Sequence, residues 1–410
     1  MNAIHVPPDP AAALSRRINR ITMNPIIRTL NQVRALEREG RKFANFSVGE
    51  PDFDTPLHIQ EAAIAAMRRG ETRYTTSDGT AVLKEAIQRK FRRENGLDYK
   101  LTQISVGAGA KQIIYNALVC TLNEGDEVVI PAPYWTTYPE VVTVCDGKPV
   151  IVNCTRAQGF KLGADALEAA ITPRTKWLIL NSPSNPTGGV YTAAELGALA
   201  DVLRRHPQVM IMSDDMYEHL LYDGESFATI AQVAPELFGR TLTVNGVSKT
   251  YAMTGWRIGY AGGAEPLIKA MATIQSQATS NPCSISQAAA AAALDGPQEI
   301  VVERNAIFEK RRDRMVRLLN DVPGFSCDTP RGAFYAYVDC SALMGKRTPQ
   351  GAVIQDDTAL AGYLLEHGGV ALVQGAGFGF SPYLRLSYAA SLEEIEEGGR
   401  RLREACAVLV

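Results

Sequence analysis

The chain has 410 residues, of which 46% are hydrophobic, and its 42 basic residues nearly balance its 44 acidic ones. A chain of this length can bury a large core, and its alternating strand and helix patterns indicate an α/β architecture with more than one domain. The near-neutral charge provides no long-range field that would recruit nucleic acid or an anionic membrane. No apolar run reaches the roughly 18 residues that a membrane-spanning helix needs.

The seven cysteines show no Cys-x-x-Cys spacing and do not cluster with the five histidines along the sequence. We therefore expect reduced thiols and no metal site. Residues 1–15 contain prolines and Asp9 where a signal peptide would have an apolar core. These features together predict a cytoplasmic protein.

The first candidate binding segment is Val-Gly-Ala-Gly-Ala-Lys-Gln-Ile, at residues 106–113. A strand is expected to give way to a helix here, and the free amides and dipole of a helix N-terminus favour an anion such as phosphate. Gly109 and Ala110 are the expected amide donors. A dinucleotide-binding loop is the alternative, but no acidic residue ends a second strand about 20 residues further on, as that motif requires.

A proline-punctuated loop at residues 131–138 follows the next predicted strand and carries Trp135. The flat ring of a tryptophan can stack on a planar ligand and fix its orientation while leaving the opposite face of the ligand free. The alternative interpretation is a tryptophan that simply belongs to the hydrophobic core.

Two further apolar runs, at residues 177–180 and 209–212, predict buried strands that each end in polar side chains. A loop with Asn185 follows the first run, and the second leads into Asp214, Asp215 and Tyr217. Neighbouring side chains of an extended strand face opposite ways, so only one of the two adjacent carboxylates is expected to reach a given site.

The segment at residues 248–257 places Lys249 eight residues before Arg257. A lysine amine can bond covalently to an aldehyde, and the planar guanidinium of an arginine can hold phosphate oxygens through several donors. An aldehyde and a phosphate are both present in pyridoxal 5'-phosphate. Taken alone, a lysine and an arginine in a polar loop are more often solvated surface groups.

The order Asn185, Asp214-x-x-Tyr217, Ser248-Lys249 and Arg257 resembles that of the class I/II aminotransferases of fold type I. The resemblance runs from about residue 45 to residue 386. It implies the α/β fold of the fold-type I pyridoxal-phosphate-dependent transferases, which have a large domain with a mostly parallel sheet and a smaller α/β domain. It also implies an enzyme that exchanges amino groups between amino acids and 2-oxo acids.

The resemblance further suggests where the domains lie. We expect the large cofactor-binding domain over residues 51–297 and the C-terminal small domain over residues 298–410, while residues 1–50 would form an N-terminal arm and part of the small domain. Substrate would then bind between the domains, and domain closure is expected to accompany binding.

The resemblance assigns a role to each matching residue. Asp214 would hold the proton on the cofactor's ring nitrogen through a charge-assisted hydrogen bond. Lys249 would bond to the cofactor and, once displaced by substrate, act as the base at the substrate's alpha carbon. Tyr217 and Asn185 would contact the cofactor's phenolate oxygen. The other expected cofactor-binding residues are Gly109, Ala110, Lys111, Trp135, Ser248, Arg257 and Tyr74.

Arg385 matches the family's arginine for the substrate's alpha-carboxylate and lies in an alternating strand pattern, so its side chain points to one definite face. Bidentate pairing with a carboxylate would contribute about 1.5 to 3 kcal/mol. The alternative is an ion pair with a nearby acid of the chain. Gly49 resembles the glycine whose amide meets the same carboxylate.

Tyr74 matches a tyrosine that, in the family, reaches from one subunit into the phosphate site of the other. This match implies a homodimer with shared active sites. The alternative is an aromatic residue of an ordinary loop.

Several motifs, among them Gly-Glu-Pro-Asp-Phe-Asp-Thr-Pro and Asp-Asp-Met-Tyr-Glu-His-Leu, resemble the bacterial aspartate aminotransferases of the aspartate/prephenate subgroup. In that subgroup a lysine at the position of Lys111 pairs with the distal carboxylate of the substrate. A cation is needed there because an unpaired buried carboxylate is costly. Lys111 therefore indicates aspartate and 2-oxoglutarate, with Trp135 and Asn185 as further substrate contacts, unless it serves the phosphate or is merely solvated.

Ile26 departs from this pattern. Relatives active on prephenate resemble one another in a Ser-Ala-Thr segment whose threonine lies near the substrate's distal group, whereas Ile26 can donate no hydrogen bond. This departure argues against prephenate amination, and prephenate stays an alternative substrate beside aspartate.

Other classes of function remain open at this stage. Aromatic amino acids or alanine are alternative substrates, and lyases and decarboxylases use the same cofactor machinery. A cofactor-binding transcriptional regulator would need a DNA-reading domain, for which the first 40 residues show no helix-turn-helix pattern. The segment at residues 340–357 is predicted to be a surface insertion and has no functional interpretation.

Overall fold

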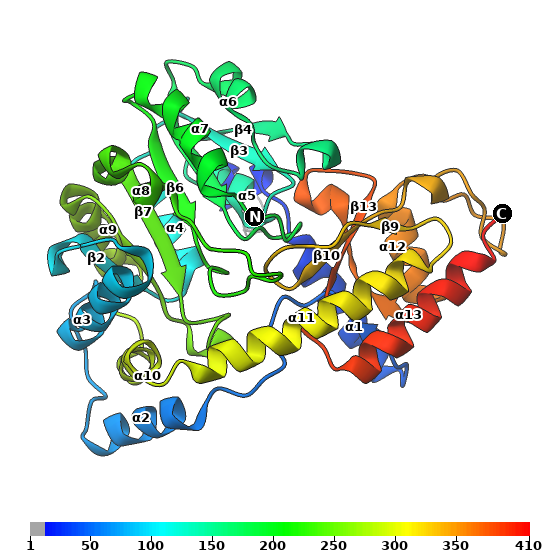
Figure 1. Ribbon diagram of the computed structural model, residues 1–410, viewed down its shortest axis with the longest axis horizontal. Helices are drawn as coiled ribbons and strands as arrows, with labels where there is room; N and C mark the ends of the chain where they lie inside the picture. Colours follow the sequence, from blue (N-terminus) through cyan, green and yellow to red (C-terminus); the bar gives the residue numbers. More distant parts are fainter. Residues whose placement is uncertain (1–12) are drawn as a thin grey trace, which may run out of the picture.

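Two sheets of different size lie side by side in the computed structural model, which describes residues 13–410 (Figure 1). Helices cover both sheets, so the predicted α/β class is confirmed. Most of the segment in which we predicted no signal peptide, residues 1–15, lies outside the described residues.

The larger sheet has seven strands in the order β2-β8-β7-β6-β5-β3-β4. Strand β8 pairs antiparallel with both β2 and β7, and all pairs among β3 to β7 are parallel. The predicted mostly parallel sheet is therefore confirmed. The strands are β2 Ile104–Gly107, β3 Glu127–Ala132, β4 Lys148–Asn153, β5 Thr175–Asn181, β6 Met210–Asp214, β7 Thr241–Gly246 and β8 Gly259–Gly262.

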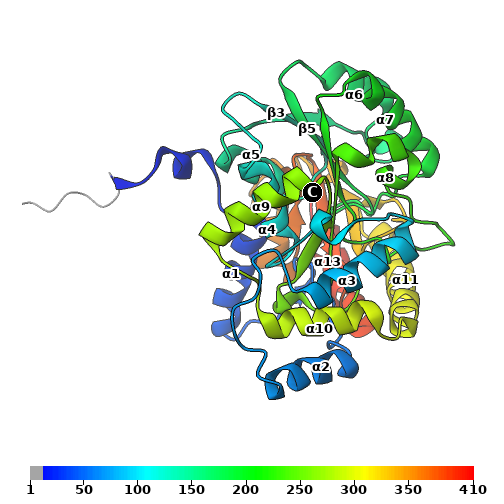
Figure 2. The same cartoon turned by 90° about the vertical axis from the view of Figure 1, so that its left-hand side faces the viewer.

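Helices pack on both faces of this sheet, because its central strands are apolar on both sides. Figure 2 shows α4, α5 and α9 on one side and α6, α7 and α8 on the other. The helices are α4 Ala110–Val119, α5 Thr137–Val144, α6 Ala164–Ala170, α7 Ala193–Arg205, α8 Ile230–Val233 and α9 Glu265–Ala278. Because β3 to β7 are parallel, their carboxyl ends lie at one edge of the sheet, which is where ligands bind in such folds.

The smaller sheet is antiparallel and has the order β12-β13-β10-β9. A separate parallel pair, β1 with β11, attaches the N-terminal part of the chain to the C-terminal part. Helix α11 extends in Figure 1 from near α10 (Ser284–Asp295) to the smaller sheet, where it packs against α13 and β10. These elements are β1 Ala44–Asn45, β9 Ser326–Cys327, β10 Tyr335–Asp339, β11 Val370–Ala371, β12 Val373–Gln374, β13 Tyr383–Ser387, α11 Glu299–Asn320, α12 Asp357–Glu366 and α13 Leu392–Ala407.

The remaining helices border the space between the two sheets or cover the edge of the larger one. They are α1 Pro25–Arg38, α2 Leu57–Arg68, α3 Ala81–Lys90 and α10 Ser284–Asp295. A buried cluster of its own joins α2, α3 and α10. No helix within residues 13–410 is both long and apolar enough to cross a membrane.

The segment at residues 340–357 is not a simple surface insertion, so that prediction is wrong. Leu343 and Ile354 are buried and belong to the main hydrophobic core. Arg347 and Val410 exchange backbone hydrogen bonds, of 2.6 and 3.1 Å, which tie the segment to the C-terminal residue. The prediction failed because the polar composition of the turn gave no sign of the apolar side chains that pack beneath it.

Candidate active site

A cavity of about 330 Å³ opens at the carboxyl ends of the parallel strands, where the larger sheet faces the smaller one. Its walls come from distant parts of the sequence, and every predicted site residue except Gly109 and Tyr74 lines it. The predicted residues at the cavity are Gly49, Ala110, Lys111, Trp135, Asn185, Asp214, Tyr217, Ser248, Lys249, Arg257 and Arg385.

Lys249 lies in the loop that follows β7, with its amine inside the cavity. The amine donates a hydrogen bond to the carbonyl oxygen of Gly49 at 2.6 Å. Burial lowers the pKa of Lys249 to about 8, and the positive charges of Arg257 and Arg385 act in the same direction. A substantial fraction of the amine is therefore neutral near pH 8, as a nucleophile or base requires.

Asp214 ends β6 and is only 4% exposed. The hydroxyl of Tyr138 donates to Asp214 Oδ2 at 2.5 Å, and the amide of Met216 donates to Oδ1 at 3.3 Å. Burial raises the pKa of Asp214 to about 6. A cationic ring nitrogen placed beside this carboxyl would favour its ionised form.

The neighbouring carboxyl, that of Asp215, does not line the cavity. It accepts a hydrogen bond from the hydroxyl of Ser213 at 2.7 Å instead. The alternation of side chains in the strand thus separates the two acids as the sequence predicted.

The anion-binding end of the cavity is formed by the first turn of α4 and by Arg257. Arg257 has a left-handed backbone, with φ 58°, and its guanidinium donates to the carbonyl oxygens of Thr254 and Ala108 at 3.0 and 3.2 Å. Gly109, the N-cap of α4, also has a positive φ, of 88°. An added Cβ there would lie 2.3 Å from Arg257 Nη2, so glycine leaves the space that the guanidinium occupies.

The two backbone amides that we predicted as phosphate donors differ in whether they already have a hydrogen-bond acceptor. The amide of Gly109 donates to the carbonyl oxygen of Gly107 at 2.8 Å, so it is already engaged within the loop. Ala110 lines the cavity at the first turn of α4, where helix geometry leaves amides without an intrahelical acceptor. The structure therefore shows Gly109 leaving room for Arg257, while its amide is already bonded within the loop.

Arg385 is fully buried, yet no carboxylate within residues 13–410 pairs with it. Its guanidinium donates to the carbonyl oxygen of Ser47 at 2.5 Å and to Asn185 Oδ1 at 3.1 Å, and its Nε has no hydrogen-bond partner. The rings of Tyr335 and Phe378 lie 4.6 and 5.0 Å from the guanidinium carbon. The alternative of an internal ion pair is wrong, and the unpaired buried cation is set up to receive an anion.

Lys111 and Trp135 line the same cavity as Arg385 and contact each other. The Lys111 amine lies 5.0 Å from the centre of the Trp135 ring, within range of a cation–π contact. Partial burial lowers the pKa of Lys111, and the charge of Arg257 adds to this effect. Ile26 and Ile27, at the start of α1, also line the cavity.

Sequence reasoning missed several groups at this cavity. Tyr335 shares a 2.8 Å hydrogen bond with the hydroxyl of Tyr217, and a Cβ at Gly49 would lie 2.3 Å from the Tyr335 oxygen. Asn181 donates to the carbonyl oxygen of Asp214 at 2.9 Å, which ties two loops together. The place of Tyr335 at the cavity follows only from the pairing of β10 with β13. Asn181 could have been predicted, because it is a polar residue at the end of a predicted strand. The others are Asn24, Ile27, Tyr138, Met216 and Thr254.

Tyr74 does not reach the cavity of its own chain. It is 92% exposed, although it is an aromatic residue. The single chain therefore gives it no packing role.

The residues at the cavity fit pyridoxal 5'-phosphate. The cofactor requires an amine for its aldehyde, a carboxylate for its ring nitrogen, and a cation with free amides for its phosphate. Lys249, Asp214 and Arg257 with the α4 N-terminus supply these groups from separate elements around one cavity. The fold and the cavity together define an enzyme of the pyridoxal-phosphate-dependent, fold-type I class.

Comparisons with known proteins agree with this class. The family model described as aminotransferase class I and II matches residues 41–402. An aspartate aminotransferase of Rhizobium meliloti (strain 1021) is 54% identical over 390 residues, which are 95% of each chain. An aspartate/prephenate aminotransferase of Cereibacter sphaeroides is 56% identical over 398 residues, which are 97% of this chain and 100% of the relative.

Solved structures lead to the same family. The crystal structure of an aspartate aminotransferase from Rhizobium meliloti is similar with a TM-score of 0.94 and 53% identity, covering 97% of this chain and 99% of the other. An aspartate aminotransferase from Thermus thermophilus with maleate gives 0.88 and 40%, with coverage of 96% and 99%. The chain belongs to the class I and II aminotransferases, which use pyridoxal phosphate. The lyase, regulator and dinucleotide-binding alternatives are therefore wrong.

Proposed function

We propose that this aminotransferase transfers the amino group of aspartate to 2-oxoglutarate, giving oxaloacetate and glutamate. The observation that carries the proposal is the pair of cations at one cavity, Arg385 and Lys111, which match the two carboxylates of such substrates. Relatives at 54% and 56% identity carry the names aspartate aminotransferase and aspartate/prephenate aminotransferase. A structurally similar relative was solved with maleate, a dicarboxylate.

Each of these residues has a separate role in the proposed reaction. Arg385 holds the alpha-carboxylate, and Lys111 holds the distal one, so the substrate's alpha carbon faces the Lys249 amine. The cofactor, when bound, supplies an electron sink for the bonds at that carbon. Lys249 takes up and returns the proton at the alpha carbon, a role that suits an amine whose pKa is about 8.

Replacing Lys111 with alanine is expected to lower kcat/KM for aspartate about 10- to 100-fold, because a charged hydrogen bond of about 1.5 to 3 kcal/mol is lost. The kcat/KM for phenylalanine, which has no distal carboxylate, should change less than about threefold. Steady-state assays with both amino acids test this difference, and Lys111→Arg serves as the charge-preserving control. Unchanged aspartate kinetics in Lys111→Ala would show that the distal carboxylate binds elsewhere.

A second candidate function is the amination of prephenate, favoured by the names of several relatives. Ile26 lines the cavity at the start of α1 and offers an apolar surface to the distal end of a substrate. We therefore propose that prephenate is a poor acceptor. An assay with aspartate as amino donor compares 2-oxoglutarate with prephenate as acceptor, and we expect oxaloacetate to form much more slowly with prephenate.

We also propose a homodimer in which Tyr74 completes the phosphate site of the partner subunit. The support is its 92% exposure in the single chain together with its match to the family's intersubunit tyrosine. Mixing Tyr74→Ala with Lys249→Ala protein under conditions that exchange subunits should restore about one quarter of wild-type activity. Random exchange makes about half of the dimers hybrid, and each hybrid has one complete site.

No recovery in the exchanged mixture, with hybrid dimers confirmed by native mass spectrometry, would mean that Tyr74 serves its own subunit or none. The matched control mixes Tyr74→Ala with wild-type protein. That mixture also forms hybrids and should lose activity only in proportion to its mutant sites.

The domain division and the cellular location extend the same proposal. We propose a cofactor-binding domain over residues 51–297 and a smaller domain from residues 298–410 with part of residues 1–50. The break between α10 and α11 and the pairing of β1 with β11 support these limits. A cytoplasmic location is supported by all seven cysteines being free thiols.

A further inference from the structure

A buried cluster of charged and amide side chains lies behind the cavity, outside the residues that line it. Its members come from the end of α3 with the π-helical turn after it, from the segment after β6, and from β7. We call this group the Lys90 cluster, and it consists of Lys90, Glu94, Asn95, Glu218, His219 and Asn245.

The centre of the Lys90 cluster is a fully buried ion pair between Lys90 and Glu218. Lys90 also donates to Asn95 Oδ1 at 2.8 Å, and the side-chain amides of Asn95 and Asn245 each donate to Glu218 at 2.7 Å. Burial opposes the charge of Glu218 and is the largest single effect, but Lys90, His219 and Asn95 together outweigh it, so the pKa of Glu218 is lowered. A buried pair with its remaining oxygens satisfied holds its parts in a single arrangement.

Three of these side chains could in principle hold a metal ion. The candidate ligand atoms of Glu94, Glu218 and His219 lie within 4.8 Å of one another. The Lys90 ammonium already bonds Glu218 and lies 3.4 Å from Glu94, so the positive charge that two carboxylates attract is supplied by the chain. The cluster is thus an internal ion network, and its role has to be sought in what it connects.

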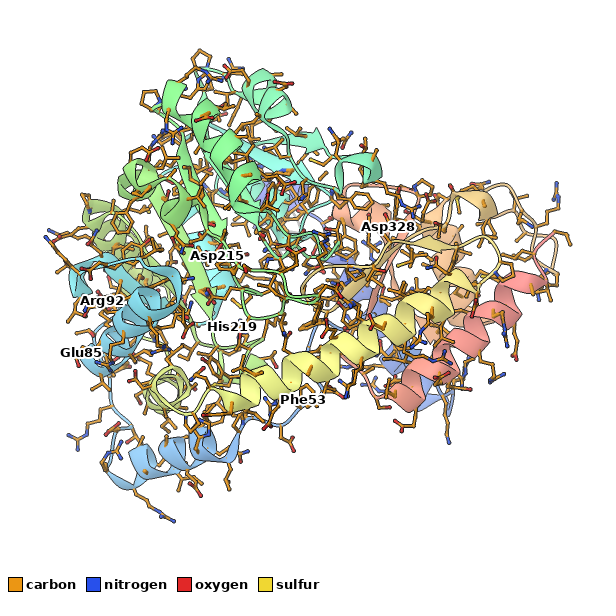
Figure 3. All side chains as sticks on the ribbon, viewed as in Figure 1. Phe53, Glu85, Arg92, Asp215, His219 and Asp328 are labelled. Carbon is orange, nitrogen blue, oxygen red and sulfur yellow. The ribbon has the colours of Figure 1, made fainter. Side chains whose placement is uncertain are left out.

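The Lys90 cluster is joined to the two loops that carry the reacting groups. Glu218 and His219 directly follow Tyr217, and Figure 3 labels Asp215 and His219 at the two ends of this short segment after β6. His219 Nδ1 forms a 3.1 Å hydrogen bond with the Thr250 hydroxyl, and Thr250 directly follows Lys249. His219 Nε2 forms a 3.0 Å hydrogen bond with Glu94. The imidazole therefore bridges the lysine loop and the ion network.

We propose that His219 is a positioning residue for Lys249. Through the Thr250 hydroxyl, His219 couples the lysine loop to the Lys90 cluster. This coupling fixes the position of the Lys249 amine relative to Tyr217 and Asp214. The proposal rests on the proposed function, in which Lys249 bonds the cofactor and moves the proton. A displacement of about 1 Å in such an amine can cost on the order of 100-fold in rate.

Thr250→Val removes the hydroxyl with little change in shape, and Thr250→Ser keeps it, so the two form a matched pair. In Thr250→Val and in His219→Ala we expect kcat for aspartate to fall about 10- to 100-fold while KM stays within about threefold. Thr250→Ser should retain wild-type kcat within about threefold. Equal losses in Thr250→Val and Thr250→Ser would overturn the proposal.

A second measurement uses the protein freed of cofactor and needs no turnover. The rate at which acetic anhydride labels Lys249, followed by mass spectrometry across pH, reports the pKa of that amine, which is about 8 in the wild type. If the loop is released, the amine becomes more hydrated, so the labelling midpoint should rise toward the ordinary lysine value of about 10.4 in Thr250→Val but not in Thr250→Ser.

Borohydride reduction of the cofactor-loaded wild type separates this proposal from the proposed function. Cofactor fixed to a lysine other than Lys249 would overturn the function assigned to Lys249 and the positioning role with it. If the cofactor is fixed to Lys249 but the labelling midpoint and kcat are unchanged in Thr250→Val and His219→Ala, only the positioning role of His219 is overturned.

Discussion

Lys249→Ala protein is expected to lose transamination by at least about 10⁴-fold, the upper end of what a single general base contributes, because the same amine also bonds the cofactor. The amine lies inside the cavity and donates a hydrogen bond to the Gly49 carbonyl oxygen at 2.6 Å. No other lysine lining the cavity can replace it, because Lys111 lies beside the Trp135 ring. Coupled assays with aspartate and 2-oxoglutarate measure the loss.

Cofactor binding provides the control for this variant. Arg257, the α4 N-terminus and Asp214 remain in place in Lys249→Ala, so the protein should still take up pyridoxal phosphate, though without a covalent bond that survives borohydride and denaturation. Added methylamine, a small amine of matching chemistry, should restore part of the activity. Activity above about a hundredth of wild type, without added amine, would contradict the role given to Lys249.

Asp214→Asn protein is expected to lose on the order of 100-fold or more in kcat, because a neutral amide cannot stabilise the proton on the cofactor's ring nitrogen. Asp214 is 4% exposed, so no solvent can take its place. Steady-state rates of the cofactor-loaded variant measure the effect. Asp215→Asn is the matched comparison, since that carboxyl lies outside the cavity, and its kcat should fall far less.

The protein without cofactor gives an independent check on Asp214. The pKa of Asp214 is raised to about 6 by burial, so the folded state keeps this proton at pH values where the unfolded chain has lost it. The free energy of unfolding should therefore fall as pH rises between about 4 and about 6, and this contribution should be missing in Asp214→Asn. Identical pH profiles of unfolding in the two proteins would contradict the burial of this carboxyl.

The sequence predicts the residues at strand ends well, and the reason is geometric. Parallel strands place their carboxyl ends at one edge, so the loop with Asn185, which follows β5, was expected near Asp214 at the end of β6. The period of two along β6 also distinguished Asp214 from Asp215. The helix that begins at Ala110 was expected where the strand ending near Val106 gives way to a helix at the glycine-containing segment.

Residues whose position depends on distant pairing were missed for an equally physical reason. Tyr335 reaches Tyr217 only because β10 pairs with β13 and the smaller sheet faces the larger one. Lys90 and Glu218 are 128 positions apart, and each alone has the composition of a surface residue. Buried polar networks of this kind leave no local periodicity, so only the folded arrangement reveals them.

The most direct test of the central claim is a half-reaction: cofactor-loaded protein is mixed with excess aspartate and no oxo acid, and both the visible absorbance of the cofactor and the oxaloacetate released are followed. We expect stoichiometric loss of that absorbance with one oxaloacetate per site, and its return on adding 2-oxoglutarate but not prephenate. Unchanged absorbance and no oxaloacetate would contradict aspartate as the amino donor and remove the role given to Lys111.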